Sequence, residues 1–325
     1  SFDANLFVQG ISFKDYAALR DSWKIPLFNR VVQGQYPPGS TLKPIMGLAG
    51  LESGVIGEFE TVEDPGYFQL PNEEHKYRDW KKGGHGSGVN LKKAIAESCD
   101  TYFFEMSYRL GIDRLSPFLG EFGLGQPTGV DFSSERSGLL PSREWKRAVR
   151  GLPWFPGDTL NMGIGQGDML ATPIQLAYAT SIVASKGKRV KPRVVKKIDG
   201  QPTSIRREPD LILQNAHYWD VVQKAMEEVT HGARGTARRS ASDLEYRMAG
   251  KTGTAQVVGI KQGEEYDPEQ LATIHLDHAL FVGYAPADKP EIAVAVVIEN
   301  GQHGSSTAAP MARALFDAYL LRADN

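Results

Sequence analysis

The sequence predicts an α+β fold in which helices cover an antiparallel sheet and part of the chain forms an all-helical subdomain. Three observations predict this class. Stretches with helical spacing of apolar residues fill the middle of the chain, strand-like apolar runs gather near its C-terminus, and the last two runs are joined by the proline-flanked segment 286–290. A short connection between two strands is typical of antiparallel pairing, so we expect an antiparallel sheet.

Composition limits the possible functions. The chain has 325 residues, 41% of them hydrophobic, which is enough for a substantial core in one large domain or two. Lysine plus arginine (37) nearly balances aspartate plus glutamate (39), so nothing indicates a nucleic-acid or anionic-lipid partner. The single cysteine, Cys99, excludes an intrachain disulfide. No apolar run reaches the roughly 18 residues of a membrane span, and no signal peptide opens the chain. The start at Ser1 suggests a trimmed or processed fragment, from which an anchor could have been removed.

Each predicted element follows from its apolar spacing and its boundary residues. Helices are predicted from Ser40 to about residues 53–54, over 91–110, from a Thr172 cap with Pro173 in the first turn, over 218–229 and over 306–321. Strands are predicted over 248–258, 279–284 and 292–299, with short strands and turns over 188–215. Residues 57–90 and the glycine- and proline-rich connector 120–156 are expected to be irregular. A loop as long as 57–90 usually has a function or is held in place by specific contacts.

Ser40 and Lys43 lie three residues apart, where the first helix begins after Pro37-Pro38-Gly39. The positive end of a helix dipole and the free N–H groups there stabilise negative charge on a serine oxygen and on an attacked carbonyl. A neighbouring lysine can take the serine proton. Pro44 removes a helical hydrogen bond, so we expect an irregular first turn. A second Ser-x-x-Lys, Ser185 to Lys188, is predicted at a helix C-terminus, where the dipole has the wrong sign.

Ser98 and Asp100 lie inside the predicted helix 91–110, two residues apart. On a continuous helix their side chains would point about 200° from each other. If the two residues cooperate, the helix must break there, with Asp100 as N-cap of its second half.

The segment Lys251-Thr252-Gly253-Thr254 lies within the predicted strand 248–258. A glycine on an edge strand would let a substrate backbone approach and pair with the strand. The lysine supplies positive charge, and the two threonines supply hydroxyls for a carboxylate.

Ser-x-x-Lys, Ser-x-Asp and Lys-Thr-Gly in this order are closely similar to the motif set of class A β-lactamases and penicillin-binding proteins. Within these, the chain resembles class B penicillin-binding proteins over nearly its whole length. The segments that carry the resemblance are Tyr36-Pro37-Pro38-Gly39-Ser40-Thr41-Leu42-Lys43-Pro44, Ser98-Cys99-Asp100-Thr101-Tyr102-Phe103, Gly163-Ile164-Gly165-Gln166-Gly167 with Thr172-Pro173, and Lys251-Thr252-Gly253-Thr254-Ala255-Gln256. Aspartate in place of the more usual asparagine at Asp100, together with the segment 80–88, resembles the penicillin-binding protein 2 branch of the rod-elongation machinery.

The resemblance implies a fold like that of serine β-lactamases and penicillin-binding transpeptidases. Residues 1–325 would form one transpeptidase domain, helical and loop-rich over about 40–185 and sheet-forming over about 186–325. Further strands upstream of Ser1, a pedestal domain and a membrane anchor belong to the family pattern and are expected to be absent from this chain.

The resemblance also implies roles for the catalytic residues. Ser40 would be the acyl-enzyme nucleophile and Lys43 its general base. Ser98 would relay a proton to the leaving amine with help from Lys251. Asp100 would hold Lys43 or contact the substrate.

Substrate binding is implied for the late strand and the nucleophile. Thr252 and Thr254 would bind the terminal carboxylate of a D-Ala-D-Ala stem peptide or a β-lactam, with Gly253 between them. The backbone N–H groups of Ser40 and Thr254 would form the oxyanion hole.

The function implied is a peptidoglycan DD-transpeptidase that needs no cofactor for catalysis. It would act at the periplasmic face of the bacterial inner membrane, with a membrane glycosyltransferase and elongation-complex proteins as partners. Two alternatives remain open at this stage: a serine β-lactamase, for which no deacylating glutamate stands out, and a non-catalytic penicillin-binding sensor or scaffold.

A possible structural zinc site is the remaining prediction. Asp64, Asp79 and His85 lie in the irregular stretch 57–90 and Cys99 lies in the second motif, and this set can ligate zinc tetrahedrally. The alternative is a buried thiol on the helix stripe with solvated acids. The resemblance to penicillin-binding protein 2 favours the metal.

Overall fold

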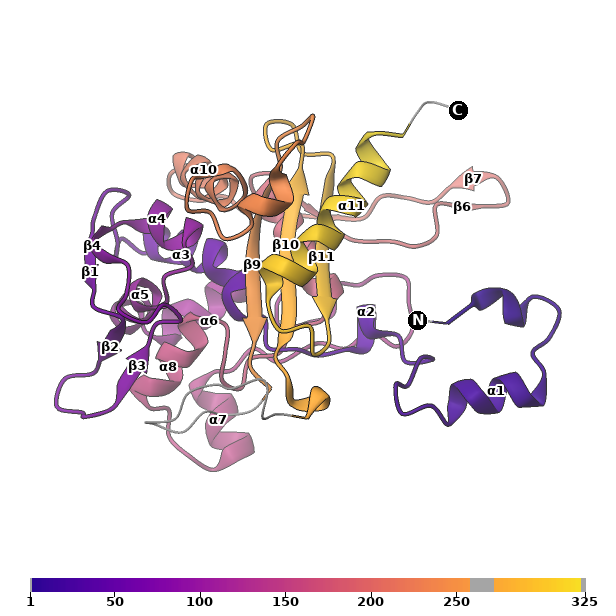
Figure 1. Ribbon diagram of the computed structural model, residues 1–325, viewed down its shortest axis with the longest axis horizontal. Helices are drawn as coiled ribbons and strands as arrows, with labels where there is room; N and C mark the ends of the chain where they lie inside the picture. The colour runs from indigo at the N-terminus through magenta and orange to yellow at the C-terminus, as the bar shows by residue number, and fades with distance from the viewer. Residues whose placement is uncertain (1, 258–271, 323–325) are drawn as a thin grey trace.

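The computed structural model describes residues 2–257 and 272–322, and its centre is a three-stranded antiparallel sheet (Figure 1). The strand order is β11 (Ile292–Ile298), β10 (His278–Ala285), β9 (Ala249–Ala255), so β10 is central. Thr252 pairs with Phe281, which pairs with Val296 across β10. The three strands and the turn between β10 and β11 therefore match the prediction. Residue 258, the predicted end of the first strand, lies outside the described residues.

Helices pack against this sheet and form a second body beside it. Those that contact the sheet are α9 (Pro173–Ala184), α10 (His217–His231) and α11 (Ala309–Leu320), the last following the π-turn η6 (Gly304–Ala308). Those of the helical part are α3 (Lys43–Glu52), α4 (Leu91–Ala96), α5 (Asp100–Leu110), α6 (Ile112–Gly120), α7 (Arg143–Arg150) and α8 (Pro156–Gly163). In Figure 1, α11 crosses in front of the sheet, while α3, α4 and α5 lie to one side of β9.

The remaining elements are short. They are η1 (Ala4–Phe7), α1 (Phe13–Arg20), α2 (Arg30–Gln33), η2 (Gly39–Leu42), β1 (Val62–Asp64), β2 (Tyr67–Gln69), β3 (Lys76–Arg78), β4 (Gly86–Val89), β5 (Arg189–Val190), β6 (Lys197–Ile198), β7 (Gln201–Pro202), β8 (Arg207–Glu208), η3 (Arg238–Ala241) and η5 (Thr273–His275). The stretch 57–90 thus contains two small antiparallel pairs, β1–β4 and β2–β3, and 188–215 contains two more.

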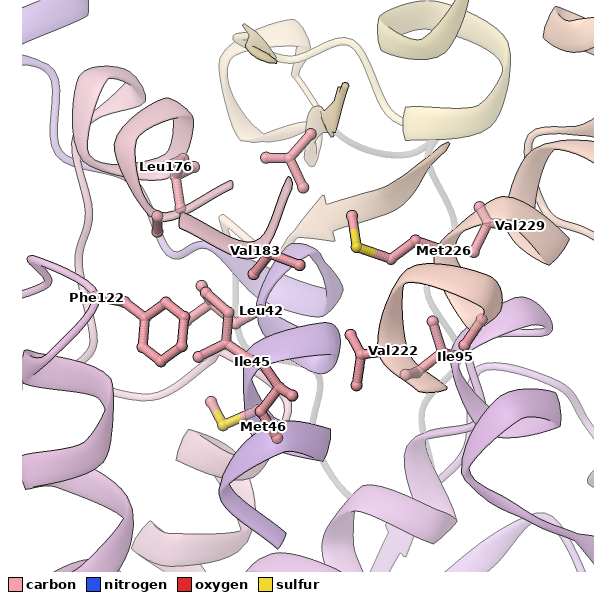
Figure 2. Packing of buried hydrophobic residues seen from close by; sticks show 14 of the residues in the cluster. Leu42, Ile45, Met46, Ile95, Phe122, Leu176, Val183, Val222, Met226 and Val229 are labelled. Atoms are coloured by element: carbon pink, nitrogen blue, oxygen red, sulfur yellow. The ribbon is translucent and has the colours of Figure 1, made fainter. Parts of the chain in front are cut away.

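Helix α3 lies at the centre of the core. Residues 43–51 are all buried, and a helix that is apolar on every side is stable only when neighbours cover it completely. In Figure 2, Ile45 and Met46 of α3 lie near Val183 of α9 and Val222 of α10. All four residues belong to one hydrophobic cluster. The turn that carries Ser40 thus leads directly into a helix that is buried over residues 43–51.

The structure corrects several details of the predicted helices. The predicted helix 91–110 is two helices, α4 and α5, and the N-cap of α5 is Cys99 rather than Asp100. Cys99 Sγ accepts the N–H of Tyr102 at 3.4 Å, a role that the sequence assigned to a carboxylate. Helix α7 lies inside the connector expected to be irregular. By contrast, Thr172 caps α9 as predicted.

The N-terminal segment packs little against the rest. No residue of η1 or α1 is buried, and Figure 1 shows both away from the sheet. Across residues 2–257 and 272–322, no helix combines the length and the apolar character that a membrane crossing requires.

Gly304 sets how closely η6 approaches the sheet. A Cβ there would collide with the carbonyl oxygens of Leu280 and Gly253. We expect Gly304→Ala to lower the free energy of unfolding by ~1–3 kcal/mol, the usual cost of overpacking. Urea unfolding would measure it. Gly120→Ala is the control, because the nearest atom to its Cβ is 3.7 Å away; equal stability of the two variants would contradict the prediction.

Candidate active site

Ser40 lies in the 3₁₀ turn η2, directly before α3. Its neighbours Gly39, Thr41 and Leu42 are buried, whereas Ser40 is partly exposed. Gly39 has φ +54°, and its N–H donates to Gly165 O at 2.8 Å. The irregular turn predicted from Pro44 is therefore present, and it presents the serine at the positive end of a buried helix.

Lys43 is completely buried and is held by the second motif. Its Nζ lies 2.7 Å from Asp100 Oδ1, 2.7 Å from the carbonyl oxygen of Ser98 and 3.3 Å from Ser98 Oγ. The ammonium also faces the ring of Phe103, 5.4 Å from its centroid. Lys43 and Asp100 thus form a buried ion pair in which the lysine has further hydrogen bonds, as a buried charge requires.

The break between α4 and α5 brings Ser98 and Asp100 together. Ser98 adopts φ +61°, in the left-handed region that non-glycine residues rarely occupy. On an unbroken helix the two side chains would diverge, but here both reach Lys43. The conditional prediction of a helix break is correct.

Lys251, from β9, reaches the same serine. Its Nζ lies 2.9 Å from Ser98 Oγ and 3.0 Å from Thr252 O, and the residue is fully buried. Burial lowers the pKa of Lys251 well below its ordinary value, and the positive charge of Lys43 lowers it further, against a smaller opposing effect of Asp100. The hydroxyl of Ser98 therefore lies between two lysine nitrogens, an arrangement that can pass a proton.

The edge strand β9 presents Thr252 and Thr254 beside these groups. Thr252 Oγ1 lies 2.8 Å from the hydroxyl of Thr236. The space that a side chain at Gly253 would need is taken by Thr41, whose Cγ2 would lie 2.7 Å from the added Cβ. The glycine thus makes room for the nucleophile turn, a reason different from the substrate approach suggested by the sequence.

Sequence reasoning assigned no role to three residues around the site, one of which acts through its backbone. The backbone N–H of Trp80 donates to Asp100 Oδ2 at 3.2 Å, Thr236 contacts Thr252, and Gln166 Nε2 donates to Thr254 O at 3.1 Å. Gln166 and Trp80 lie in segments that carry the family resemblance, 163–167 and 80–88, whereas Thr236 lies in a segment without a recognised pattern. The rival Ser185 lies at the C-terminus of α9, where its hydroxyl donates to a backbone carbonyl.

A cluster of four buried residues lies behind the second motif. The ligand atoms of Asp64, Asp79, His85 and Cys99 all lie within 4.8 Å of one another. Asp64 Oδ2 lies 2.7 Å from His85 Nδ1 and 3.3 Å from Cys99 Sγ. Within the described part of the chain, His85 Nε2 is buried without a hydrogen-bond partner. The structure therefore brings together all four residues predicted from the sequence.

This cluster also supports the active site directly. Asp79 Oδ2 accepts the N–H groups of Asp100 at 2.7 Å and Thr101 at 3.1 Å, at the start of α5. Burial and the charge of Asp100 raise the Asp79 pKa. Burial alone would raise the pKa of Asp64 too, but the hydrogen bonds that it accepts lower the pKa to about 2.

A family model described as the penicillin binding protein transpeptidase domain matches residues 1–317. The chain belongs to this family. The resemblance predicted from the three motifs, and the fold class with it, is thereby confirmed.

Proteins named MrdA and structures named PBP2 are among the similar proteins. The peptidoglycan D,D-transpeptidase MrdA of Acinetobacter baumannii is 49% identical over 99% of this chain and 48% of its own length, and that of Escherichia coli K12 is 42% identical over 100% and 52%. The structure of Pseudomonas aeruginosa PBP2 in complex with WCK 5153 is 52% identical, with a TM-score of 0.90 over 99% of this chain and 67% of that one. The chain spans about half the length of the curated relatives it matches.

The low pKa of Lys251 predicts a pH dependence of stability. Between that pKa and the ordinary value of 10.5, the unfolded chain binds a proton that the native state does not, so stability rises with pH in this window. Lys251→Met lacks this contribution. We expect the unfolding free energy of the wild type, relative to that of Lys251→Met, to rise from neutral pH towards 10.5 in urea titrations.

The matched control is Lys186→Met, which changes an exposed lysine paired with Asp220. Its stability should follow the wild-type pH curve in parallel. A curve for Lys251→Met that also runs parallel to the wild type would contradict a depressed Lys251 pKa.

Proposed function

We propose that this chain carries the catalytic domain of a peptidoglycan DD-transpeptidase that cross-links stem peptides through an acyl-serine intermediate and is inhibited covalently by β-lactams. The observation that carries the proposal is the contact of Ser98 with both Lys43 and Lys251, which joins three distant motifs beside the Ser40 turn. The names of the MrdA relatives support the same reaction.

The chemistry follows from the positions of these groups. Ser40 Oγ attacks the carbonyl carbon of the penultimate D-alanine and loses its proton to Lys43, which acts as general base once its own proton has passed through Ser98 to Lys251. The C–N bond breaks, and the departing D-alanine takes a proton relayed through Ser98 with the help of Lys251. An acceptor amine then attacks the ester, and its proton returns by the same route as Ser40 is released.

Substrate orientation falls to the edge strand. The hydroxyls of Thr252 and Thr254 would bind the terminal carboxylate, beside the one positive charge that Lys43 and Lys251 share. The backbone N–H groups of Ser40 and Thr254 would stabilise the oxyanion, each by roughly 2.7–4 kcal/mol.

The setting is proposed from the relatives. A Helicobacter pylori PBP2 has been solved in complex with MreC, and another similar structure belongs to a peptidoglycan synthase complex. We propose partners of the same kind, including a membrane glycosyltransferase, and work at the periplasmic face of the inner membrane. A serine β-lactamase and a penicillin-binding sensor are the functions to be excluded.

Labelling with a fluorescent penicillin tests the nucleophile. We expect a stable adduct on the wild type, complete loss of labelling in Ser40→Ala, and unchanged labelling in Ser185→Ala, the second Ser-x-x-Lys copy. Persistent labelling of Ser40→Ala would contradict the assignment. Rapid release of the label by water would indicate a β-lactamase, and failure to transfer a D-Ala-D-Ala donor to an amine would indicate a sensor.

We further propose that Asp64, Asp79, His85 and Cys99 hold a structural zinc ion. The donor set suits zinc, whose ligands in a tetrahedral site lie roughly 3.3–3.8 Å apart. Asp64, Asp79 and Cys99 can each carry a negative charge in this buried cluster, and a divalent cation would offset that charge. The ion would brace α5, since Asp79 accepts N–H groups at its start and Cys99 is its N-cap.

Metal analysis tests this site. Protein purified without chelator should contain about one zinc per chain, and chelation should lower the melting temperature by at least ~5 °C. Cys99→Ser should lose the metal, whereas Asp158→Asn, which alters a carboxylate paired with Lys146 outside the cluster, should keep it. Absence of stoichiometric zinc together with an unchanged melt in chelator would contradict the proposal.

A further inference from the structure

The loop that follows α8 touches both sides of the proposed oxyanion hole. On one side, the carbonyl of Gly165 accepts the N–H of Gly39, the residue before Ser40, at 2.8 Å. On the other side, Gln166 Nε2 donates to Thr254 O at 3.1 Å. Two adjacent residues thus connect the nucleophile turn with the edge strand.

The direction of the Thr254 carbonyl shows where its N–H points. In an antiparallel strand, the N–H and C=O of one residue point to the same side. The carbonyls of Thr252 and Thr254 both accept hydrogen bonds from side chains, those of Lys251 and Gln166, and not from the backbone of β10. The N–H of Thr254 therefore also points away from β10, towards the nucleophile turn.

The loop after α8 is closed by hydrogen bonds at its base and packs closely against the nucleophile turn. The N–H groups of Gly165 and Gln166 donate to Met162 O and Asn161 O, each at 2.9 Å, which closes the loop on the end of α8. Gly165 has φ +72°, and a Cβ there would collide with the backbone of Gly39. The distance between the loop and the nucleophile turn is therefore fixed by the backbone.

We propose that Gln166 is a positioning residue that sets the place of the Thr254 N–H relative to the Ser40 N–H, and so the geometry of the oxyanion hole. This inference rests on the acyl-serine function proposed above. Glutamine is suited to the task because its amide reaches the Thr254 carbonyl as a donor. Methionine has similar length but no donor, and glutamate would present an acceptor to an acceptor.

The test compares Gln166→Met with the wild type during acylation by a penicillin. We expect the acylation rate constant at saturating penicillin to fall about 10-fold, because a displaced oxyanion donor stabilises the transition state less. The penicillin concentration for half-maximal rate should change less than about 2-fold, since Gln166 acts through Thr254 and not on the bound ground state. In the infrared spectrum, the ester carbonyl of the acyl-enzyme should absorb at higher frequency, because weaker hydrogen bonds polarise it less.

The matched control is Gln223→Met, which removes a glutamine amide that donates to two backbone carbonyls, those of Val183 and Ala184, away from the site. This variant should keep the wild-type rate constant and carbonyl frequency. Gln166→Glu is the second variant, and it should also slow acylation and raise the carbonyl frequency. It replaces Gln166→Met in the test if that variant does not fold.

The outcomes are distinguishable. A wild type that forms no adduct at Ser40 would contradict the proposed function itself. A wild type that is acylated normally, with unchanged rate constant and carbonyl frequency in both Gln166 variants, would overturn the positioning role alone. A change confined to the half-maximal concentration would also overturn it, because Gln166 would then be a ligand contact.

Discussion

The buried ion pair between Lys43 and Asp100 is the interaction on which the rest of the site depends. Both groups are removed from water, and such charges are tolerated only when they are paired and their remaining hydrogen-bonding capacity is satisfied. The pair requires a lysine in the first turn of α3 to meet a carboxylate in the first turn of α5. The left-handed Ser98 makes this possible, because it lies between α4 and α5 and turns the chain so that Ser98 and Asp100 both reach the same lysine.

The surrounding structure can be understood as support for this pair. Asp79 holds the start of α5 through two backbone N–H groups, and Trp80 donates to the second oxygen of Asp100. On the other side, Gly253 allows the nucleophile turn to lie against β9, so that Lys251 can reach Ser98. Lys251 is fully buried and lies near the positive charge of Lys43, and both effects lower its pKa. One nitrogen can thus serve as a positive charge while the other exchanges a proton.

Much of this could be predicted from the sequence, because the features concerned are local. Apolar periodicity located β10, β11 and α10 to within about two residues and the start of β9 to within one, although β9 ends at Ala255, before the predicted end at 258; Thr172 with Pro173 identified the start of α9. The order of three motifs was enough to indicate the family and the candidate site residues. What the sequence could not show depends on long-range contacts. Asp100 pairs with Lys43, and Cys99 is the N-cap of α5 in its place. Helix propensity predicts neither the ion pair nor the cap.

The same limit applies to side chains that act through backbone groups. Gln166 lies in a motif that assigns it no role, and its partner, the Thr254 carbonyl, is 88 residues away. The role of Gly253 was predicted as space for a substrate, yet the neighbour that fills the space, Thr41, comes from a distant turn. Sequence patterns identify candidate catalytic and ligand-binding residues well, but the residues that hold them in place can be recognised only when the packing is known.

A double-mutant cycle on Lys43 and Asp100 tests the central claim most directly, with the free energy of unfolding as the measured quantity. Lys43→Met and Asp100→Leu should each cost ~3–5 kcal/mol, because each leaves the other charge buried and unpaired. The double variant should then be at least ~2 kcal/mol more stable than the sum of the two costs predicts. Costs that add to within ~0.5 kcal/mol would show that the two residues are not coupled, and would contradict the account.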